Sequence, residues 1–493
     1  MADLAKAATY QTTEDAVTLS GRIRRRELSA QAAVGEALDR IQALNGTLAA
    51  FCTLGVDQAM AQAEAVDKRL AAGESVGALA GVPVAIKDLI STRGLRTTFG
   101  SPLYSDNVPD EDDIAVERLR AAGAIVVGKT NTSEFGYGAI SHNNLFPATR
   151  NPWNIALTPG GSSAGSASAV AAAMLPIALG SDGGGSIRVP AGLTGTFGIK
   201  PSWGRVPVYP GCRDETQPGA SGWESLEHIG PITRTVADAA LTLQVLSGPS
   251  PRDRHSLPQE SIDWTDLSPG YLAGRRIAFS ADLGFAPVDA EVAAITHAAA
   301  MALAEAFGAE LEFTAPEIED TQDLFLTLVA LDTDRAGLRA MAASQNYQFT
   351  RQLAELLDTS WSADAFSDAI MQRKRVNKLV WQFMERFDLF LTPTTATAAF
   401  PINCDGPTCI GDTRVAQSAW TPFSALANLT GLPAASVPAG FTKDGRPVGL
   451  QIMGRHLDDL GVLRAAAGVE QIKPWRNHWP EIVRGSQDVN HTA

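Results

Sequence analysis

Two clusters rich in glycine and serine contain the residues most suited to chemistry, at positions 160–163 (GGSS) and 183–186 (GGGS). Glycine lacks a Cβ atom, so it lets backbone N–H groups approach a ligand closely and adopts φ values that other residues avoid. A serine that follows three glycines therefore stands beside several unobstructed amide donors. Such donors are what an oxyanion hole requires, so the second cluster favours chemistry that passes through a tetrahedral oxyanion.

Three other interpretations of these clusters are weaker. A flexible linker is disfavoured because the uncharged, apolar segment 163–174 lies between them and must be buried. A phosphate-binding loop would end in Gly-Lys-Ser/Thr, and Asp182 would repel a phosphate. A nucleophile elbow on Ser163 fits the pattern G-x-S-x-G, but residues 154–159 (NIALTP) do not form the hydrophobic strand that should precede it.

The elements around the clusters would bury and position them. Residues 163–174 predict a tightly packed helix, Pro176 ends it, and 177–179 predict a short strand that leads into the second cluster. Upstream, the apolar strand expected at 82–86 delivers Lys87 at its end. A lysine at the end of a strand is usually a surface residue, and alone it would be given no role in catalysis. Lys87 becomes a candidate catalytic residue because it precedes the two serine clusters.

Together these segments resemble the amidase signature family. The matching motifs are Gly-x-Pro-x-x-x-Lys-Asp at 81–88, Gly-Gly-Ser-Ser at 160–163, Gly-Gly-Ser-Ile-Arg followed by Pro-Ala at 184–191, and similar segments at 128–135, 230–238, 428–434 and 445–451. The resemblance covers about residues 15–472. It implies hydrolysis of amide C–N bonds without a metal or cofactor, and the expected substrates are aryl or hydrophobic amides.

The resemblance also implies roles for individual residues. Ser186 would be the nucleophile, Ser162 the bridging serine on a cis peptide bond, and Lys87 the base. Ser162 is preferred to Ser163 because it lies 24 residues before Ser186, which is the spacing in the family. Lys87 would have to be neutral, which requires burial to disfavour its ammonium form by roughly 4–5 kcal/mol. The expected oxyanion donors are the N–H groups of Gly183, Gly184, Gly185 and Ser186, and Gly136 and Tyr137 would line the acyl pocket.

Several neighbouring residues are expected to be structural. Asp182 and Arg188 flank the nucleophile as charges that hold the loop, Ser163 caps a helix or bonds near the relay, and the lone His142 is structural or lines a pocket. The family commonly has Thr where this chain has Gly183, so this chain lacks a side chain near the oxyanion hole.

Two alternative functions use the same residues. The first is hydrolysis of carbamates (urethanes). The second is the glutaminase subunit of a glutamyl-tRNA amidotransferase-like complex, but that branch holds the glutamine ammonium with an acidic residue where this chain has Thr421.

The alternation of expected strands and helices predicts an α/β fold. We expect one domain over 1–493, with a helical N-terminal part (1–75), an α/β core (80–475), and a central mixed, mostly parallel sheet covered by helices on both faces. Strands are expected at 82–86, 124–128, 275–280, 309–313 and 388–392, and helices at 112–122, 235–247, 288–307 and within 321–386.

The composition of the 493-residue chain limits its partners. A net charge of −14 disfavours nucleic acid or an anionic membrane as the main partner. We find no signal peptide and no apolar run of membrane-spanning length, and four cysteines are too few for a disulfide framework, so a cytoplasmic location is expected. Cys404 and Cys409 are close enough to suggest a metal, but no second Cys or His pair lies nearby. The expected partners are a small-molecule amide or carbamate and a second copy of the chain in a homodimer.

Overall fold

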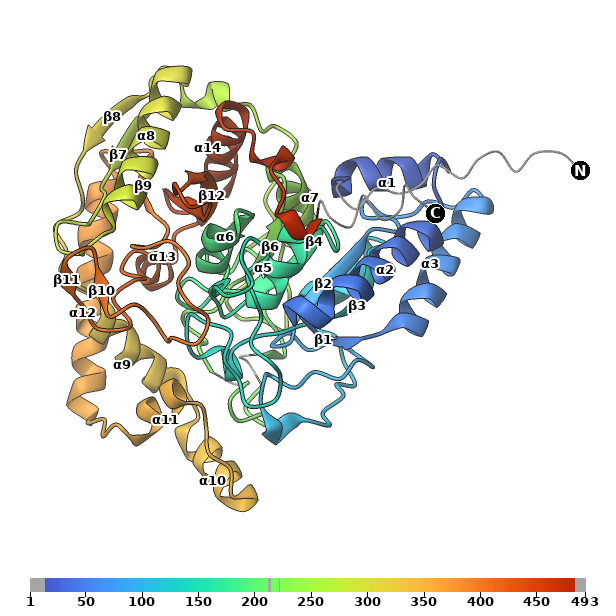
Figure 1. Cartoon of the computed structure of the whole chain (residues 1–493), viewed down its shortest axis with the longest axis horizontal. Helices are drawn as coiled ribbons and strands as arrows, with labels where there is room; N and C mark the ends of the chain where they lie inside the picture. Colours follow the sequence, from blue (N-terminus) through green and yellow to red (C-terminus); the bar gives the residue numbers. More distant parts are fainter. Residues whose placement is uncertain (1–13, 212–213, 221, 484–493) are drawn as a thin grey trace, which may run out of the picture.

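The computed structural model describes residues 14–211, 214–220 and 222–483. Within them, eleven strands form one sheet with the spatial order β1-β3-β2-β4-β6-β5-β12-β13-β9-β7-β8 (Figure 1). Their bounds in that order are Phe51–Leu54, Ile125–Thr130, Pro83–Lys87, Ile177–Ser181, Ile229–Thr233, Phe197–Lys200, Ala434–Phe441, Pro447–Gly454, Leu389–Pro393, Arg276–Phe279 and Glu310–Phe313. A separate two-stranded ribbon joins β10 (Cys409–Ile410) to β11 (Thr413–Arg414).

The expectation of an α/β fold with a central mixed sheet is confirmed. Parallel pairing joins β3, β2 and β4 on one side and β9, β7 and β8 on the other. The strands between these two groups, β6, β5, β12 and β13, pair antiparallel with each of their neighbours. This antiparallel centre was not expected from the sequence, because none of its four strands was identified there.

Helices flank the sheet along its whole length. Their bounds are α1 (Ala16–Arg24), α2 (Ala30–Leu48), α3 (Val56–Ala71), α4 (Ile114–Ala121), α5 (Ala164–Ala171), α6 (Arg188–Thr194), α7 (Val236–Leu246), α8 (Ala290–Phe307), α9 (Gln322–Asp332), α10 (Arg335–Gln345), α11 (Arg351–Asp358), α12 (Ala363–Met384), α13 (Ala425–Thr430) and α14 (Asp459–Ile472). The helices expected at 112–122, 235–247 and 288–307 are all present, within a few residues of the expected ends, and α1, α2 and α3 lie in the part expected to be helical (1–75).

Local sequence explains where these elements begin and end. The Ser29 side chain accepts a hydrogen bond from Ala32 N and so caps α2. Helix α5 contains only Ala, Gly, Ser and Val, and each of its residues is buried. Small side chains let its backbone approach β4 and β2 closely, so α5 holds the first Gly-Ser cluster against the sheet.

Helix α8 is the one described helix that is long and apolar enough, by length and composition alone, to span a membrane. It lies instead against β12, β13 and β9 of the sheet. Its buried residues, Val292, Thr296, Ala299, Ala300, Leu303 and Ala304, recur at helical spacing and face this contact.

Helices α9 to α12 form a separate layer beside the sheet, at the lower left of Figure 1, where α10 projects furthest from the rest. Helix α9 packs on α11, α12 and α13. Its buried residues Leu324 and Leu328 share one apolar cluster with Phe135 and Tyr137, which lie far earlier in the sequence. This layer therefore covers the segment that follows β3.

Candidate active site

Lys87 is the last residue of β2 and is fully buried. Its Nζ atom donates to Ser162 Oγ at 2.6 Å, to Ser181 Oγ at 3.0 Å and to the Ser181 carbonyl at 3.2 Å. Burial lowers the pKa of Lys87 to about 7, although the negative charges of Glu227 and Asp182 oppose this change. Near neutral pH a large fraction of this amine is therefore unprotonated and able to accept a proton.

Ser162 lies two residues before the start of α5, and its hydroxyl contacts Lys87 at the end of β2. The peptide bond from Gly161 to Ser162 is cis, as the resemblance implied. A Cβ atom built on Gly161 would lie 2.6 Å from the Ile140 carbonyl oxygen, so only glycine fits before this serine. The Ser162 side chain is 1% exposed and lines the same pocket as Ser186.

The loop between β4 and α6 carries Ser186 and is held by a buried ion pair. Arg188 donates to Asp182 from Nη2 at 2.9 Å and from Nε at 3.0 Å, and both side chains are fully buried. Burial alone would raise the pKa of Asp182, but Arg188 and a hydrogen bond from Asn428 hold it well below its usual value. Asp182 is thus a fixed anion at the base of the loop, as expected.

The same ion pair reaches the C-terminal part of the chain. Arg188 Nη1 donates to the Ser424 carbonyl at 2.8 Å and to Gln451 Oε1 at 2.7 Å. Asn428 accepts from Arg188 at 2.7 Å and donates to Asp182 Oδ1 at 2.9 Å. We refer to Asp182, Arg188, Asn428 and Gln451 as the loop clamp.

One expected oxyanion donor is corrected by this geometry. The Gly185 N–H donates to Asp182 Oδ1 at 2.7 Å, so it is already used inside the loop. The candidate donors are therefore the N–H groups of Gly183, Gly184 and Ser186. The loop turns so that the Gly185 amide points at the Asp182 carboxylate. The sequence alone does not reveal this turn.

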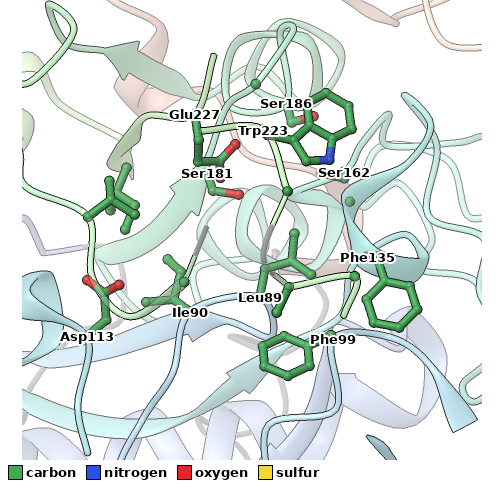
Figure 2. Close-up of a pocket in the computed structure, with 18 residues that line it drawn as sticks. Leu89, Ile90, Phe99, Asp113, Phe135, Ser162, Ser181, Ser186, Trp223 and Glu227 are labelled. Carbon is green, nitrogen blue, oxygen red and sulfur yellow. The ribbon is translucent and has the colours of Figure 1, made fainter. Parts of the chain in front are cut away.

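Two pockets meet at Ser186. We call the first the inner pocket; it is lined by Ser162, Ser181, Gly183, Glu227, Asp113 and apolar side chains that include Phe99 and Phe135 (Figure 2). We call the second the outer pocket; its wall includes Gly184, Gly185 and residues of α9, α11 and the segment 417–425. Gly136, Ser186 and Trp223 line both.

The two residues expected to bind the acyl group lie at this junction. Gly136 lines both pockets, and a Cβ atom built on it would lie 3.6 Å from Ser162 Oγ and 2.9 Å from a methyl carbon of Leu89. Tyr137 lines the outer pocket, where its ring packs edge-on against Trp223 with centroids 5.0 Å apart. Its hydroxyl forms a hydrogen bond with Thr333 Oγ1 at the end of α9.

Ser163 lies away from both pockets. It is fully buried, its Oγ donates to the Ser181 carbonyl at 3.2 Å, and its N–H donates to the Ser186 carbonyl at 3.2 Å. A nucleophile at this position would have no access to a substrate, which disfavours the nucleophile-elbow interpretation. Ser163 instead ties the two clusters together.

His142, Cys404 and Cys409 line neither of the two pockets. The His142 ring bonds the Ile402 carbonyl at 2.8 Å, so it joins two loops. Cys404 and Cys409 are free thiols. Among the described residues, no group of three or more His, Cys, Asp or Glu side chains is arranged to hold a metal ion.

Sequence reasoning did not single out three residues of this site: Ser181, Trp223 and Glu227, although it placed the segment 205–228 at the rim of the site. Ser181 ends β4 directly before Asp182, and that position at a strand terminus was the one signal that could have indicated it. Trp223 and Glu227 lie between β5 and β6, where no pattern connects them to the serine clusters.

The arrangement supports transfer of a proton between buried groups. A neutral Lys87 amine can accept a proton from the Ser162 hydroxyl, which can in turn accept one from a hydroxyl in the same pocket. The free amides of the glycine loop can hydrogen-bond a developing oxyanion. These are the elements of nucleophilic acyl transfer.

Comparison with known proteins agrees with this chemistry. The family model named Amidase matches residues 32–463. The acylamidase of Rhodococcus erythropolis is 35% identical over 459 residues, which cover 90% of this chain and 92% of the relative. A glutamyl-tRNA(Gln) amidotransferase subunit from Alkaliphilus metalliredigens (strain QYMF) is likewise 35% identical, over 88% of this chain and 91% of the relative.

Among solved structures, a bacterial aryl acylamidase of the amidase signature enzymes superimposes with a TM-score of 0.86. It is 30% identical, and the match covers 96% of this chain and 98% of the other. The family model, the relatives and the shared fold thus agree over most of the sequence. The chain therefore belongs to the amidase signature family of amide hydrolases.

Proposed function

We propose that the protein hydrolyses carboxylic amides through an acyl-enzyme on Ser186, with Ser162 and Lys87 as its proton relay. The observation that carries the proposal is the 2.6 Å hydrogen bond from buried Lys87 to Ser162, on the wall of the pocket that also contains Ser186. Membership of an amide hydrolase family supports the same reaction.

The proposed reaction has two halves. In the first, Ser186 Oγ attacks the amide carbon while its proton passes to Ser162 Oγ and the Ser162 proton passes to Lys87 Nζ. The N–H groups of Gly183, Gly184 and Ser186 hydrogen-bond the oxyanion, and the C–N bond breaks as the amine nitrogen takes a proton from Ser162, which Lys87 replaces. In the second half, water attacks the ester carbon while its proton passes through Ser162 to Lys87. The ester C–O bond then breaks, the relay returns the proton to Ser186 Oγ, and the acid leaves.

We propose aryl or hydrophobic amides as the substrates, because the outer pocket is rich in large apolar side chains. Tyr137, Trp223, Phe325, Leu356, Trp361 and Trp420 line it. Burying apolar substrate surface against such a wall contributes about 25 cal/mol per Å². The acylamidase relative is consistent with this class.

The glutaminase alternative draws support from the amidotransferase relatives, which match as well as the acylamidase does. The residue in the position of the expected ammonium ligand is Thr421, and it lines the outer pocket. A hydroxyl cannot neutralise an ammonium group, so we place this function second. Carbamate hydrolysis uses the same relay and differs only in the atom next to the acyl carbon.

A fluorophosphonate or sulfonyl fluoride probe tests the proposal. We expect peptide mass spectrometry to find the label on Ser186, and Ser186→Ala to lose both labelling and amide turnover. A substrate panel of matched anilides, primary amides, esters, aryl carbamates and free glutamine would distinguish the candidate reactions. Labelling of Ser163, or amide turnover retained by the Ser186→Ala variant, would refute the acyl-enzyme.

A cytoplasmic location, a homodimeric state and independence from nucleic acid and membrane remain proposals. The net charge of −14 supports the last of these. Sedimentation of the purified chain at several concentrations would establish whether it self-associates.

A further inference from the structure

The two pockets that meet at Ser186 differ greatly in size. Measured as the space open to the centre of a water molecule, the inner pocket has a volume of about 40 Å³ and the outer pocket about 530 Å³. By the same measure, the inner pocket is therefore far smaller than the outer one. An amide whose carbonyl carbon lies at Ser186 must therefore place its larger substituent in the outer pocket.

The position of Ser162 decides which substituent faces which pocket. When the C–N bond breaks, the departing nitrogen needs a proton, and in the proposed relay the group that supplies it is Ser162 Oγ. Ser162 lines the inner pocket, whereas its neighbour Gly161 lines the outer one. The amine nitrogen must approach Ser162 to within hydrogen-bond distance, so its substituent extends into the inner pocket.

Trp223 is the wall between the two spaces. Figure 2 shows its ring beside Ser186 at the top of the inner pocket, with Phe99 at the bottom of the view. Tyr137 and Phe325 hold the ring from the outer side, with centroids 5.0 and 5.9 Å from it. Trp223 has a φ of +71°, a left-handed conformation that is rare for such a bulky residue.

The lack of a side chain on Gly183 leaves space for the Trp223 ring. A Cβ atom built on Gly183 would lie 2.4 Å from Trp223 Cε3, which is closer than real Cβ contacts allow. Gly183 is also the place where the family resemblance led us to expect Thr. In this chain the Trp223 ring occupies the space that such a side chain would fill.

We propose that the inner pocket receives the leaving amine and the outer pocket the acyl group, with Trp223 as the wall that keeps the amine small. The enzyme then prefers amides that join a bulky hydrophobic acyl group to ammonia or a short alkylamine. This inference rests on the proposed Ser186 mechanism and specifies its substrate class.

A pair of isomeric substrates tests the assignment in the wild-type enzyme. In 4-phenylbutanamide the phenyl group belongs to the acyl side, and in N-(2-phenylethyl)acetamide it belongs to the amine. We expect kcat/KM to be at least about tenfold higher for the first isomer, because one methylene too many in a hydrophobic pocket already lowers kcat/KM by about 10- to 200-fold. Equal rates, or a faster second isomer, would overturn the assignment.

Substitution of Trp223 tests the wall itself. We compare 4-phenylbutanamide with its N-methyl and N-benzyl derivatives, which vary the amine while the acyl group stays fixed. Trp223→Ala should raise the N-benzyl to primary amide ratio of kcat/KM at least about fivefold. Trp223→Leu, which keeps an apolar contact with Tyr137 and Phe325, is the second variant and should act in the same direction.

Leu326→Ala is the matched control, because Leu326 lines only the outer pocket, not the inner one, and is 37% exposed. It should leave the ratio within the amine series unchanged. An unchanged ratio in both Trp223 variants, or an equal rise in Leu326→Ala, would refute Trp223 as the wall. Turnover retained by Ser186→Ala would refute the proposed function. A wild-type enzyme that is active but prefers the acetamide isomer would refute only the pocket assignment.

Discussion

At the scale of single residues, the unprotonated amine of Lys87 is the group on which the proposed reaction depends. Its pKa of about 7 means that kcat/KM should rise with pH through about 7 and then level off. Lys87→Arg keeps a permanent positive charge and should lose at least about 10³-fold in kcat/KM. Measuring kcat/KM from about pH 5.5 to 9 checks both expectations.

Cys409→Ser provides the control for that profile, because Cys409 is exposed and lines neither pocket. It should keep the same midpoint. A Lys87→Arg enzyme within tenfold of the wild type at neutral pH would contradict the role of the amine.

The contact between Gly183 and Trp223 gives a second expectation at this scale. In Gly183→Ala the new methyl group would collide with the indole ring, so kcat/KM for a primary amide should fall. In the double variant Gly183→Ala/Trp223→Ala this collision is absent. A double-mutant cycle on kcat/KM should therefore show a coupling of at least about 1 kcal/mol; additive losses would mean that the two residues do not interact.

The sequence predicted the residues that belong to contiguous motifs, and it missed those that arrive through the fold. Lys87, Ser162 and Ser186 each lie in such a motif. In the structure Ser162 and Ser186 line the inner pocket, and Lys87 donates a hydrogen bond to Ser162. Ser181 and Trp223 were not singled out, because their parts in the site depend on which segments lie opposite them. The Gly185 amide was assigned wrongly because a nearby side chain competes for it.

At the scale of elements, the central strands of the sheet were hidden by proline and glycine. Strand β6 contains Gly230 and Pro231, and β12 contains Pro438, all of which argue against an inner strand. The structure accommodates them locally: β5 pairs with β6 only at Ile232 and Thr233, and β12 shifts register after Pro438. The flanking strands β2, β3, β7 and β9 were predicted because their apolar runs are less interrupted.

The loop clamp makes an expectation about the β4–α6 element. Asp182→Asn would leave Arg188 as a buried, poorly compensated charge, and breaking a buried pair in this way costs about 3–5 kcal/mol. Urea unfolding should show a loss of that size together with reduced amide turnover. Glu312→Gln, in an exposed pair with Arg276, is the control and should cost less than about 1 kcal/mol. Similar losses in the two variants would contradict the importance of the clamp.

At the scale of the whole molecule, the buried Lys87 should lower stability near neutral pH. The folded protein holds this lysine with a pKa of about 7, whereas a free lysine has about 10.4. Between those values the unfolded chain binds the extra proton, so this group favours unfolding more strongly as pH falls from about 10 to 7, and the effect stays at its full size below about 7. Its full size is roughly 3–6 kcal/mol.

Lys87→Met removes this contribution. The free energy of unfolding of the variant minus that of the wild type should therefore increase as pH falls from about 9.5 to 7, while turnover is lost. Urea unfolding of both proteins at the two pH values measures the difference. Lys68→Met, at an exposed lysine, should show no such change with pH. A difference that does not vary with pH would mean that Lys87 titrates normally.

The loop clamp joins parts of the chain that are made at very different times. Lys87, Ser162 and Ser186 all lie in the first two fifths of the sequence, but Arg188 is held by groups at positions 424, 428 and 451. A ribosome that has released only residues 1–420 has therefore produced every atom proposed to react and none of these three anchors. Hydrolytic competence should then begin only when synthesis is nearly complete, and a C-terminal truncation before residue 424 should yield an inert fragment.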